Sequence, residues 1–301
     1  MHDLPYEQDP DWKSALERLS HIRLEEDYST GNVEFIRQEL QSFDDRVRGG
    51  AALAAAGCLF EPDILDAVIN IAETDGNMAI RKAAIQSLGA VIYEGVMQNL
   101  EDEHGAGADM DDADEWLEYQ TGNLRDDYLR VKNLLFNLLE YEDDLGMQEL
   151  ALSALADLGF LAPIQEKISE FFSSPRQSSK LVALHAMGKY PQYWKEELEE
   201  LIRPDAPTAL LKEAISASYS SYSARLAKAI EGVLQHSDPE VLRYALLTLA
   251  NINKTEKLAD ILQHFSLHED IRVQEAARDG IEMFTRENFE KYLKGDLGLE
   301  E

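Results

Sequence analysis

The stretch IRKAAIQSLG, at residues 80–89, decides the fold of this chain. It carries an apolar residue, a variable pair, an alanine and an apolar pair on the next turn, which is the spacing of one face of an α-helix. The same frame occurs seven times, closely in six copies and more loosely in the fifth, with central alanines at Ala51, Ala84, Ala151, Ala183, Ala214, Ala245 and Ala277. These alanines are separated by 33, 67, 32, 31, 31 and 32 residues. A period in the low thirties predicts stacked helix pairs rather than a compact domain with one core.

Three other stretches share the frame and carry a family resemblance. They are VRGGAALAAAG at 47–57, MQELALSALADLG at 147–159 and SKLVALHAMG at 179–188. With IRKAAIQSLG they resemble the second-helix signature of HEAT repeats, in the short form of many prokaryotic proteins, over roughly residues 33–284. The resemblance implies an all-α fold, a right-handed α-α superhelix of about seven helix pairs behind an N-terminal capping helix. The arginine that often follows the first residue of the HEAT frame is present only at Arg48 and Arg81, and Leu211, Leu242 and Gln274 replace it later.

We therefore expect one HEAT-like solenoid domain over residues 1–301. Its expected parts are an N-terminal cap (1–30), two repeats (33–93), an acidic insertion (95–127), five repeats (128–285) and a C-terminal tail (286–301). Short polar residues that can cap the second helix of a pair precede five of the frames, at Asp45, Asn77, Asp144, Asp238 and Asp270.

Composition limits the partner and the compartment. The 301 residues include 28 Lys and Arg against 58 Asp and Glu, a net charge of −30. Nucleic-acid phosphates and anionic membranes repel such a chain, so we expect neither as a partner. The acidity fits the solubility of an elongated body, a salt-adapted host, or the capture of a basic partner. The chain has a single cysteine, Cys58, which we expect to be buried. The start MHDLPYEQDPDW has no signal-peptide pattern, and no apolar segment is long enough to span a membrane. We therefore expect a cytoplasmic protein.

The long interval between the second and third frames is acidic. Residues 95–127 hold eleven acids and one base, Arg125. We read them as a loop with a short helix near 114–119, and a degenerate eighth repeat is the alternative. The loop is a candidate partner-binding or autoinhibitory arm, through Asp109, Asp111, Asp112, Asp114 and Glu115. The spacing of these acids is a poor match to a calcium loop, since the sixth position from Asp109 lacks the required glycine.

No pattern of catalytic or metal-binding residues stands out. The seven histidines are scattered, and the sequence contains one His-Glu dipeptide, His268-Glu269, where a di-iron hydroxylase family with related repeats uses several. DNA glycosylases with similar repeats need a cationic groove, which the charge disfavours. We therefore predict no catalytic residue, no metal and no cofactor. Bilin lyases also resemble this family, so an enzyme or enzyme subunit of that type is the alternative.

The candidate partner-binding residues fall into two groups. In a HEAT-like stack the second helices line the concave side, where we expect Lys82, Gln86, Ser153, His185, Lys212, Ser216 and Arg243. The aromatic stretch KYPQYW adds Tyr190, Tyr193 and Trp194, because Tyr and Trp are frequent interface anchors. The sequence thus predicts a non-catalytic scaffold or adaptor that binds a peptide, a helix or a basic protein surface. An acidic decoy for a nucleic-acid-binding protein is a second alternative, and the oligomeric state is not specified.

Overall fold

A computed structural model describes residues 12–98, 115–252 and 256–293. Within these residues the chain forms α-helices and short 3-10 helices, and no β-strand. The all-α class predicted from the sequence is therefore confirmed for this part of the chain. The helices divide into two units, Met1–Leu158 and Gly159–Glu301. The expectation of one continuous domain stays a prediction.

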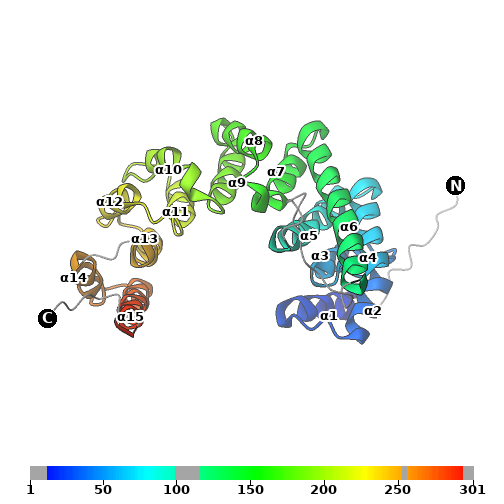
Figure 1. Ribbon diagram of the computed structural model, residues 1–301, viewed down its shortest axis with the longest axis horizontal. Coiled ribbons are helices and arrows are strands. Elements are labelled where there is room, and N and C mark those ends of the chain that lie inside the picture. The colour runs from blue at the N-terminus through cyan, green and yellow to red at the C-terminus, as the bar shows by residue number, and fades with distance from the viewer. Residues whose placement is uncertain (1–11, 99–114, 253–255, 294–301) are drawn as a thin grey trace. The chain divides into compact units, whose positions relative to one another are not determined.

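Unit 1 consists of helix pairs in two layers (Figure 1). Its helices are α1 (Trp12–Glu25), α2 (Thr30–Glu39), α3 (Asp45–Ala54), α4 (Pro62–Thr74), α5 (Met78–Met97), α6 (Glu115–Tyr141) and α7 (Leu145–Ala154). The 3-10 turns Ala55–Gly57 and Ala156–Leu158 follow α3 and α7. The helices α1, α3, α5 and α7 pack side by side in that order, while α2, α4 and α6 each cover the helix that follows them in the chain.

Unit 2 repeats this arrangement (Figure 1). Its helices are α8 (Ala162–Ser173), α9 (Gln177–Met187), α10 (Lys195–Leu201), α11 (Thr208–Ala217), α12 (Ala224–Gly232), α13 (Pro239–Ile252), α14 (Glu256–Phe265) and α15 (Ile271–Leu293), with a 3-10 turn at Pro191–Tyr193. The second helices α9, α11, α13 and α15 pack on one another in sequence order. The first helices α8, α10, α12 and α14 form the other layer, each against its own partner.

The frame residues explain how the layers pack. All seven frame alanines are fully buried, with no exposed surface. Glycines at the ends of two frames allow second helices to come close: a Cβ on Gly89 would lie 3.3 Å from the Cα of Ala154, and one on Gly188 would lie 3.1 Å from the Cα of Ala217. Leu88, Leu155, Met187 and Leu249 fill the seams between the pairs and are fully buried. Small residues therefore set the helix spacing, and large apolar residues fill what remains.

The caps of the second helices follow the prediction with one correction. Asn77, Asp144, Asp238 and Asp270 each accept a hydrogen bond from a backbone N–H in the first turn of the next helix. In the first pair the N-cap is Asp44, which accepts from the N–H of Arg46 at 2.9 Å, and not Asp45. Asp45 is instead the first residue of α3, so its carboxylate bonds to side chains of other residues.

Helix covers part of the predicted acidic insertion, which is a second correction. We expected a loop over 95–127 with a short helix near 114–119, and a separate helix from residue 128, but α5 continues to Met97 and α6 runs unbroken from Glu115 to Tyr141. The reason is that the apolar spacing starts upstream of 128, with Leu124, Tyr128, Val131 and Leu135 at steps of four, three and four residues. Tyr128 is fully buried against Gly95 of α5, where an added Cβ would lie 2.1 Å from its ring.

Candidate interaction surfaces

Two of the three candidate partner-binding residues predicted on the second helices of unit 1 lie together in the structure. Gln86 of α5 and Ser153 of α7 line one hollow, together with Gly89, Leu150, Ala154 and Asp157. The hollow measures about 140 Å³. Pockets for small-molecule substrates are several hundred Å³, so this one is too small for a substrate and large enough for a side chain of a partner.

Lys82 has a structural role beside this hollow. Its ammonium pairs with Oδ1 of Asp144 at 2.9 Å, and Asp144 also caps α7. The hydrogen bond from Lys82, together with the N–H groups at the start of α7, lowers the pKa of Asp144 from its usual range. Lys82 thus joins α5 to the start of α7. This contact makes Lys82 a weaker candidate for binding a partner than the sequence suggested.

In unit 2 the other four candidates lie on successive second helices. His185 is exposed on α9, Lys212 and Ser216 are half-buried on α11, and Arg243 is half-buried on α13. Arg243 donates through Nε to Oε2 of Glu240 at 3.0 Å and lies 4.6 Å from the ring centroid of Tyr244. Within the described residues no ion pair involves Lys212, whose side chain keeps part of its surface exposed.

Sequence reasoning missed one residue of this surface, Glu213. It lies beside Lys212 on α11 and is half-buried. Burial raises the pKa of its carboxyl, because the charged form loses hydration, and the nearby His185 lowers that pKa in part. The sequence signal that could have identified Glu213 is its position directly before the frame alanine Ala214, because that position faces the neighbouring second helices.

The two layers of unit 2 differ in charge. The second helices α9, α11, α13 and α15 carry seven bases and seven acids, of which α15 alone contributes four bases and five acids. The first helices α8, α10, α12 and α14 carry five bases and nine acids, four of which are the glutamates of KEELEEL in α10. The layer of second helices is therefore the less acidic one.

The aromatic candidates of KYPQYW separate into surface and core. Tyr193 is 52% exposed, and Tyr190 is half-buried with its ring edge-on to Phe160 at a centroid distance of 5.5 Å. Trp194 is only 5% exposed, so it packs in the core and is not a surface anchor. Its position directly before α10, in an irregular connection, gave no periodicity from which burial could be predicted.

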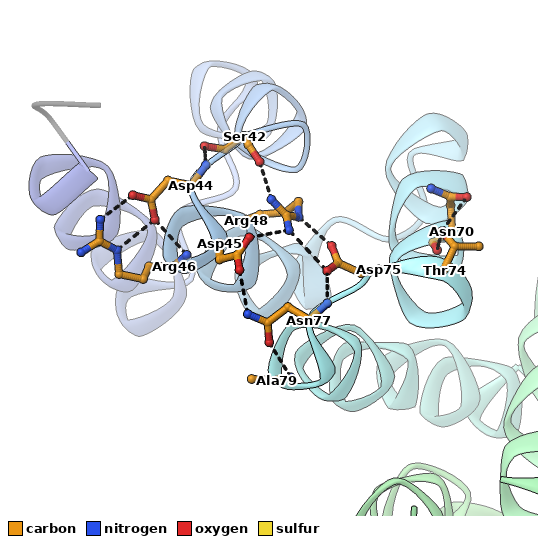
Figure 2. Close-up of polar contacts among 10 residues, drawn as sticks. All are labelled: Ser42, Asp44, Asp45, Arg46, Arg48, Asn70, Thr74, Asp75, Asn77 and Ala79. Carbon is orange, nitrogen blue, oxygen red and sulfur yellow. Dashed lines mark hydrogen bonds and ion pairs between the residues drawn. The ribbon is translucent and has the colours of Figure 1, made fainter. Parts of the chain in front are cut away.

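A polar network links the turns of the first two pairs in unit 1, as Figure 2 shows. Arg48 of α3 donates to Asp75 at 2.7 Å, to Asp45 at 2.8 Å and to the carbonyl of Ser42 at 2.7 Å. Asn77 bridges the two acids, because its side chain donates to Asp45 and its backbone N–H donates to Asp75, both at 2.8 Å. The hydrogen bond from Arg48 lowers the pKa of Asp75, and the one from Asn77 lowers the pKa of Asp45.

Beside this network lies a hollow that sequence reasoning missed. It measures about 230 Å³ and is lined by Leu40, Phe43, Ile71 and Thr74, among others. Phe43 is 99% exposed at the turn between α2 and α3. The only available signal was an aromatic residue inside the polar turn SFDD.

The frame arginines have glutamine counterparts further along the chain. Arg81 donates to the carbonyl of Ala72 and to Glu142, so both predicted frame arginines make contacts between structural elements. At the same frame position, Gln148 and Gln274 each donate to the carbonyl six residues earlier. Glutamine thus keeps the bond to the turn and lacks the charge.

The acidic candidates lie mostly outside the described residues. Asp109, Asp111, Asp112 and Asp114 fall there, and Glu115 is described only as the first residue of α6. Among the residues that the structure does describe, no group of three or more His, Cys, Asp or Glu side chains could hold a metal ion. None of the described helices is both long and apolar enough to cross a membrane.

Comparisons with known proteins place the chain in no family. No protein-family model matches it, and no curated protein matches it. Among solved structures, the X-ray structure of YibA of Escherichia coli is similar, with 11% sequence identity and a TM-score of 0.46. The match covers 94% of this chain and 100% of that one.

Proposed function

We propose that this protein is a non-catalytic scaffold or adaptor, a HEAT-like solenoid whose second-helix face receives a peptide, a helix or a basic surface of another protein. The observation that carries the proposal is the charge difference between the layers of unit 2. A layer of second helices that bears Lys212 and Arg243 and holds as many bases as acids, beside a layer of first helices with an excess of acids, is the part of this acidic chain most able to approach a neutral or mixed-charge partner.

The packing supports the same proposal. Second helices that pack side by side through fully buried alanines present one continuous row of side chains per unit. Such rows serve as binding surfaces in repeat proteins. The hollow between α5 and α7 is sized for one side chain of a partner. A cytoplasmic location belongs to the same proposal.

Charge also distributes unevenly along the chain. Residues 1–158 hold 11 bases and 35 acids, a net −24, while residues 159–301 hold 17 bases and 23 acids, a net −6. Long-range attraction of a basic partner would therefore come mainly from unit 1, and the acidic stretch before α6 would contribute to it. Replacement of Asp109, Asp111, Asp112 and Asp114 by Asn should slow association and reduce its salt dependence.

The experiment is affinity capture from the native host with the full chain, followed by binding measurements on the captured protein. The test variant is Lys212→Glu with Arg243→Glu. The matched control is Arg225→Glu with Lys228→Glu on α12, which makes the same change of net charge on the layer of first helices. We expect the test variant to bind about tenfold or more weakly and the control to bind within about threefold of the unmodified chain. Equal effects of the two variants would refute the use of the second-helix face.

A further inference from the structure

The turn between α2 and α3 places an exposed phenylalanine beside the hollow of about 230 Å³ in unit 1. Phe43 is 99% exposed, so its ring contributes almost nothing to the packing of the unit. Within the described residues, no cation and no other aromatic ring lies against it. Phe43 is nevertheless one of the residues that line the hollow. Because aromatic side chains contribute strongly to interfaces, the ring and the hollow together are a candidate binding surface.

The hollow lies between the first helix pair and α4 of the second pair. One face of α4, with residues three and four positions apart, contributes Ala67, Asn70, Ile71 and Thr74. The turn after α2 contributes Leu40, Gln41, Ser42 and Phe43. Figure 2 shows Arg48 and Asp75 between these two sides. Leu40 and Ile71 are buried, while Gln41, Asn70 and Thr74 are exposed. The hollow therefore has an apolar wall and a polar rim.

The charges around the hollow favour a cation. Arg48 donates to two carboxylates, those of Asp45 and Asp75, so this network keeps one negative charge in excess. Both α2 and α4 end at the hollow, and the C-terminal end of a helix carries a partial negative charge. Unit 1 as a whole has a net charge of −24. A positively charged side chain is thus attracted to this part of the chain at long range and on contact.

Other aromatic rings of unit 1 show which cation stacks best in this setting. The guanidinium of Arg46 lies 3.6 Å from the ring centroid of Trp12, and that of Arg18 lies 4.0 Å from the ring centroid of Phe35. The ammonium of Lys13 lies 5.4 Å from the ring centroid of Trp12. A guanidinium is planar and weakly hydrated, so it stacks closely on a ring, whereas an ammonium keeps its water. Arginine is therefore the better match to an exposed ring of this unit.

We propose that this hollow binds the side chain of an arginine from a basic segment of another protein. The aliphatic stem of the arginine packs on Leu40 and Ile71. Its guanidinium stacks on Phe43 and donates to the side-chain amide oxygens of Gln41 and Asn70. The size agrees, because an apolar cavity of about 150 Å³ holds a benzene molecule and this hollow measures about 230 Å³. It accommodates one long side chain and is smaller than most small-molecule pockets.

Other occupants fit this surface less well. An apolar side chain would take water from Gln41 and Asn70 without replacing their hydrogen bonds. An acidic side chain would be repelled by the charge of unit 1. Residues 1–11 and 99–114 of the chain contain no Lys or Arg, so they do not supply the cation. None of the candidate residues of the second-helix face lines this hollow, so the inference goes beyond the proposed function.

The test selects peptides from a phage-displayed library of random 12-residue sequences on the immobilised full chain. Peptides that also bind the immobilised Phe43→Ser variant are removed first. The retained peptides are synthesised with a fluorescent label, both as selected and with citrulline, an uncharged isostere, in place of arginine. Anisotropy then measures their binding to the unmodified chain, to Ala67→Leu, which fills the hollow, and to Phe60→Ser. Phe60→Ser is the matched control for Phe43→Ser, because it also removes an exposed phenylalanine from unit 1 and keeps the net charge.

We expect the retained peptides to contain arginine. Citrulline in the peptide and Ala67→Leu in the protein should each weaken binding about tenfold or more, and Phe60→Ser should change it less than about threefold. Retained peptides without arginine would overturn the proposal, as would peptides that bind equally well with lysine or citrulline, or binding that Ala67→Leu leaves unchanged. A selection that retains no peptide would also overturn it. None of these results would decide the proposed function, because its own test changes Lys212 and Arg243.

Discussion

Replacement of Arg48 by Met should destabilise unit 1 because it leaves a carboxylate nearly buried and unpaired. The Arg48 side chain is 18% exposed and that of Asp75 is 8% exposed. Loss of one partner of a buried ion pair costs about 3–5 kcal/mol, and an exposed pair contributes about 0–1 kcal/mol. Because this pair is only partly accessible and Asn77 still donates to Asp75, we expect a loss of about 2–3 kcal/mol at pH 7.

The pH dependence gives this prediction its sign. Arg48 lowers the pKa of Asp75 below the ordinary value of 3.8. The stabilisation is therefore fully present above the unfolded pKa, and it is lost as the pH falls through the lower folded pKa. In the variant, protonation of the buried Asp75 instead stabilises the folded protein, because the neutral carboxyl loses less hydration on burial. The difference between the two proteins should thus be largest near pH 7 and should shrink below about pH 4.

Urea-induced unfolding followed by circular dichroism, at several pH values, measures this difference. The control is Arg130→Met, because Arg130 pairs with Asp66 and both side chains are at least half exposed. The control should cost less than about 1 kcal/mol. Equal losses for the two variants, or a loss for Arg48→Met that does not change with pH, would refute the role given to the Arg48–Asp75 pair.

Two further predictions use glycine and cysteine positions. Gly95→Ala should destabilise the protein by about 1–3 kcal/mol, because the added Cβ would lie 2.1 Å from the buried ring of Tyr128. Gly31→Ala, where nothing lies within 4 Å of the added Cβ, should stabilise the protein by up to about 1 kcal/mol. Shifts of the urea midpoint in the same direction for both variants would contradict this reading. Burial raises the pKa of the Cys58 thiol to about 11, so a thiol reagent at pH 8 should react slowly with the folded chain and quickly in urea. Fast reaction of the folded chain would show that Cys58 is accessible.

The helix frame could be predicted from the sequence because alanine at a fixed period has one physical use here. It allows neighbouring helices to approach, and all seven frame alanines are buried as that use requires. Asn77 and Asp144 were recognisable for a similar reason, since short polar side chains satisfy the free N–H groups at a helix start. The choice between Asp44 and Asp45 depends on a helix boundary of one residue, which periodicity does not fix.

The surfaces could be predicted only in part. The frame placed Gln86 and Ser153 at equivalent positions, and the structure brings them to one hollow. It did not show that Lys82 pairs with Asp144, because a contact between two turns depends on how the pairs stack. The burial of Trp194 and the exposure of Tyr222 lie in irregular connections, where no period relates sequence to exposure.

The most direct test of the central claim is hydroxyl-radical footprinting of the full chain, with and without its captured partner. The claim is that the second-helix face of unit 2 makes the contact. We predict that His185 on α9 and Tyr244 on α13 become less reactive in the complex, while Tyr141 in unit 1 keeps its reactivity. Unchanged reactivity of His185 and Tyr244 in a complex that protects other residues would contradict the account.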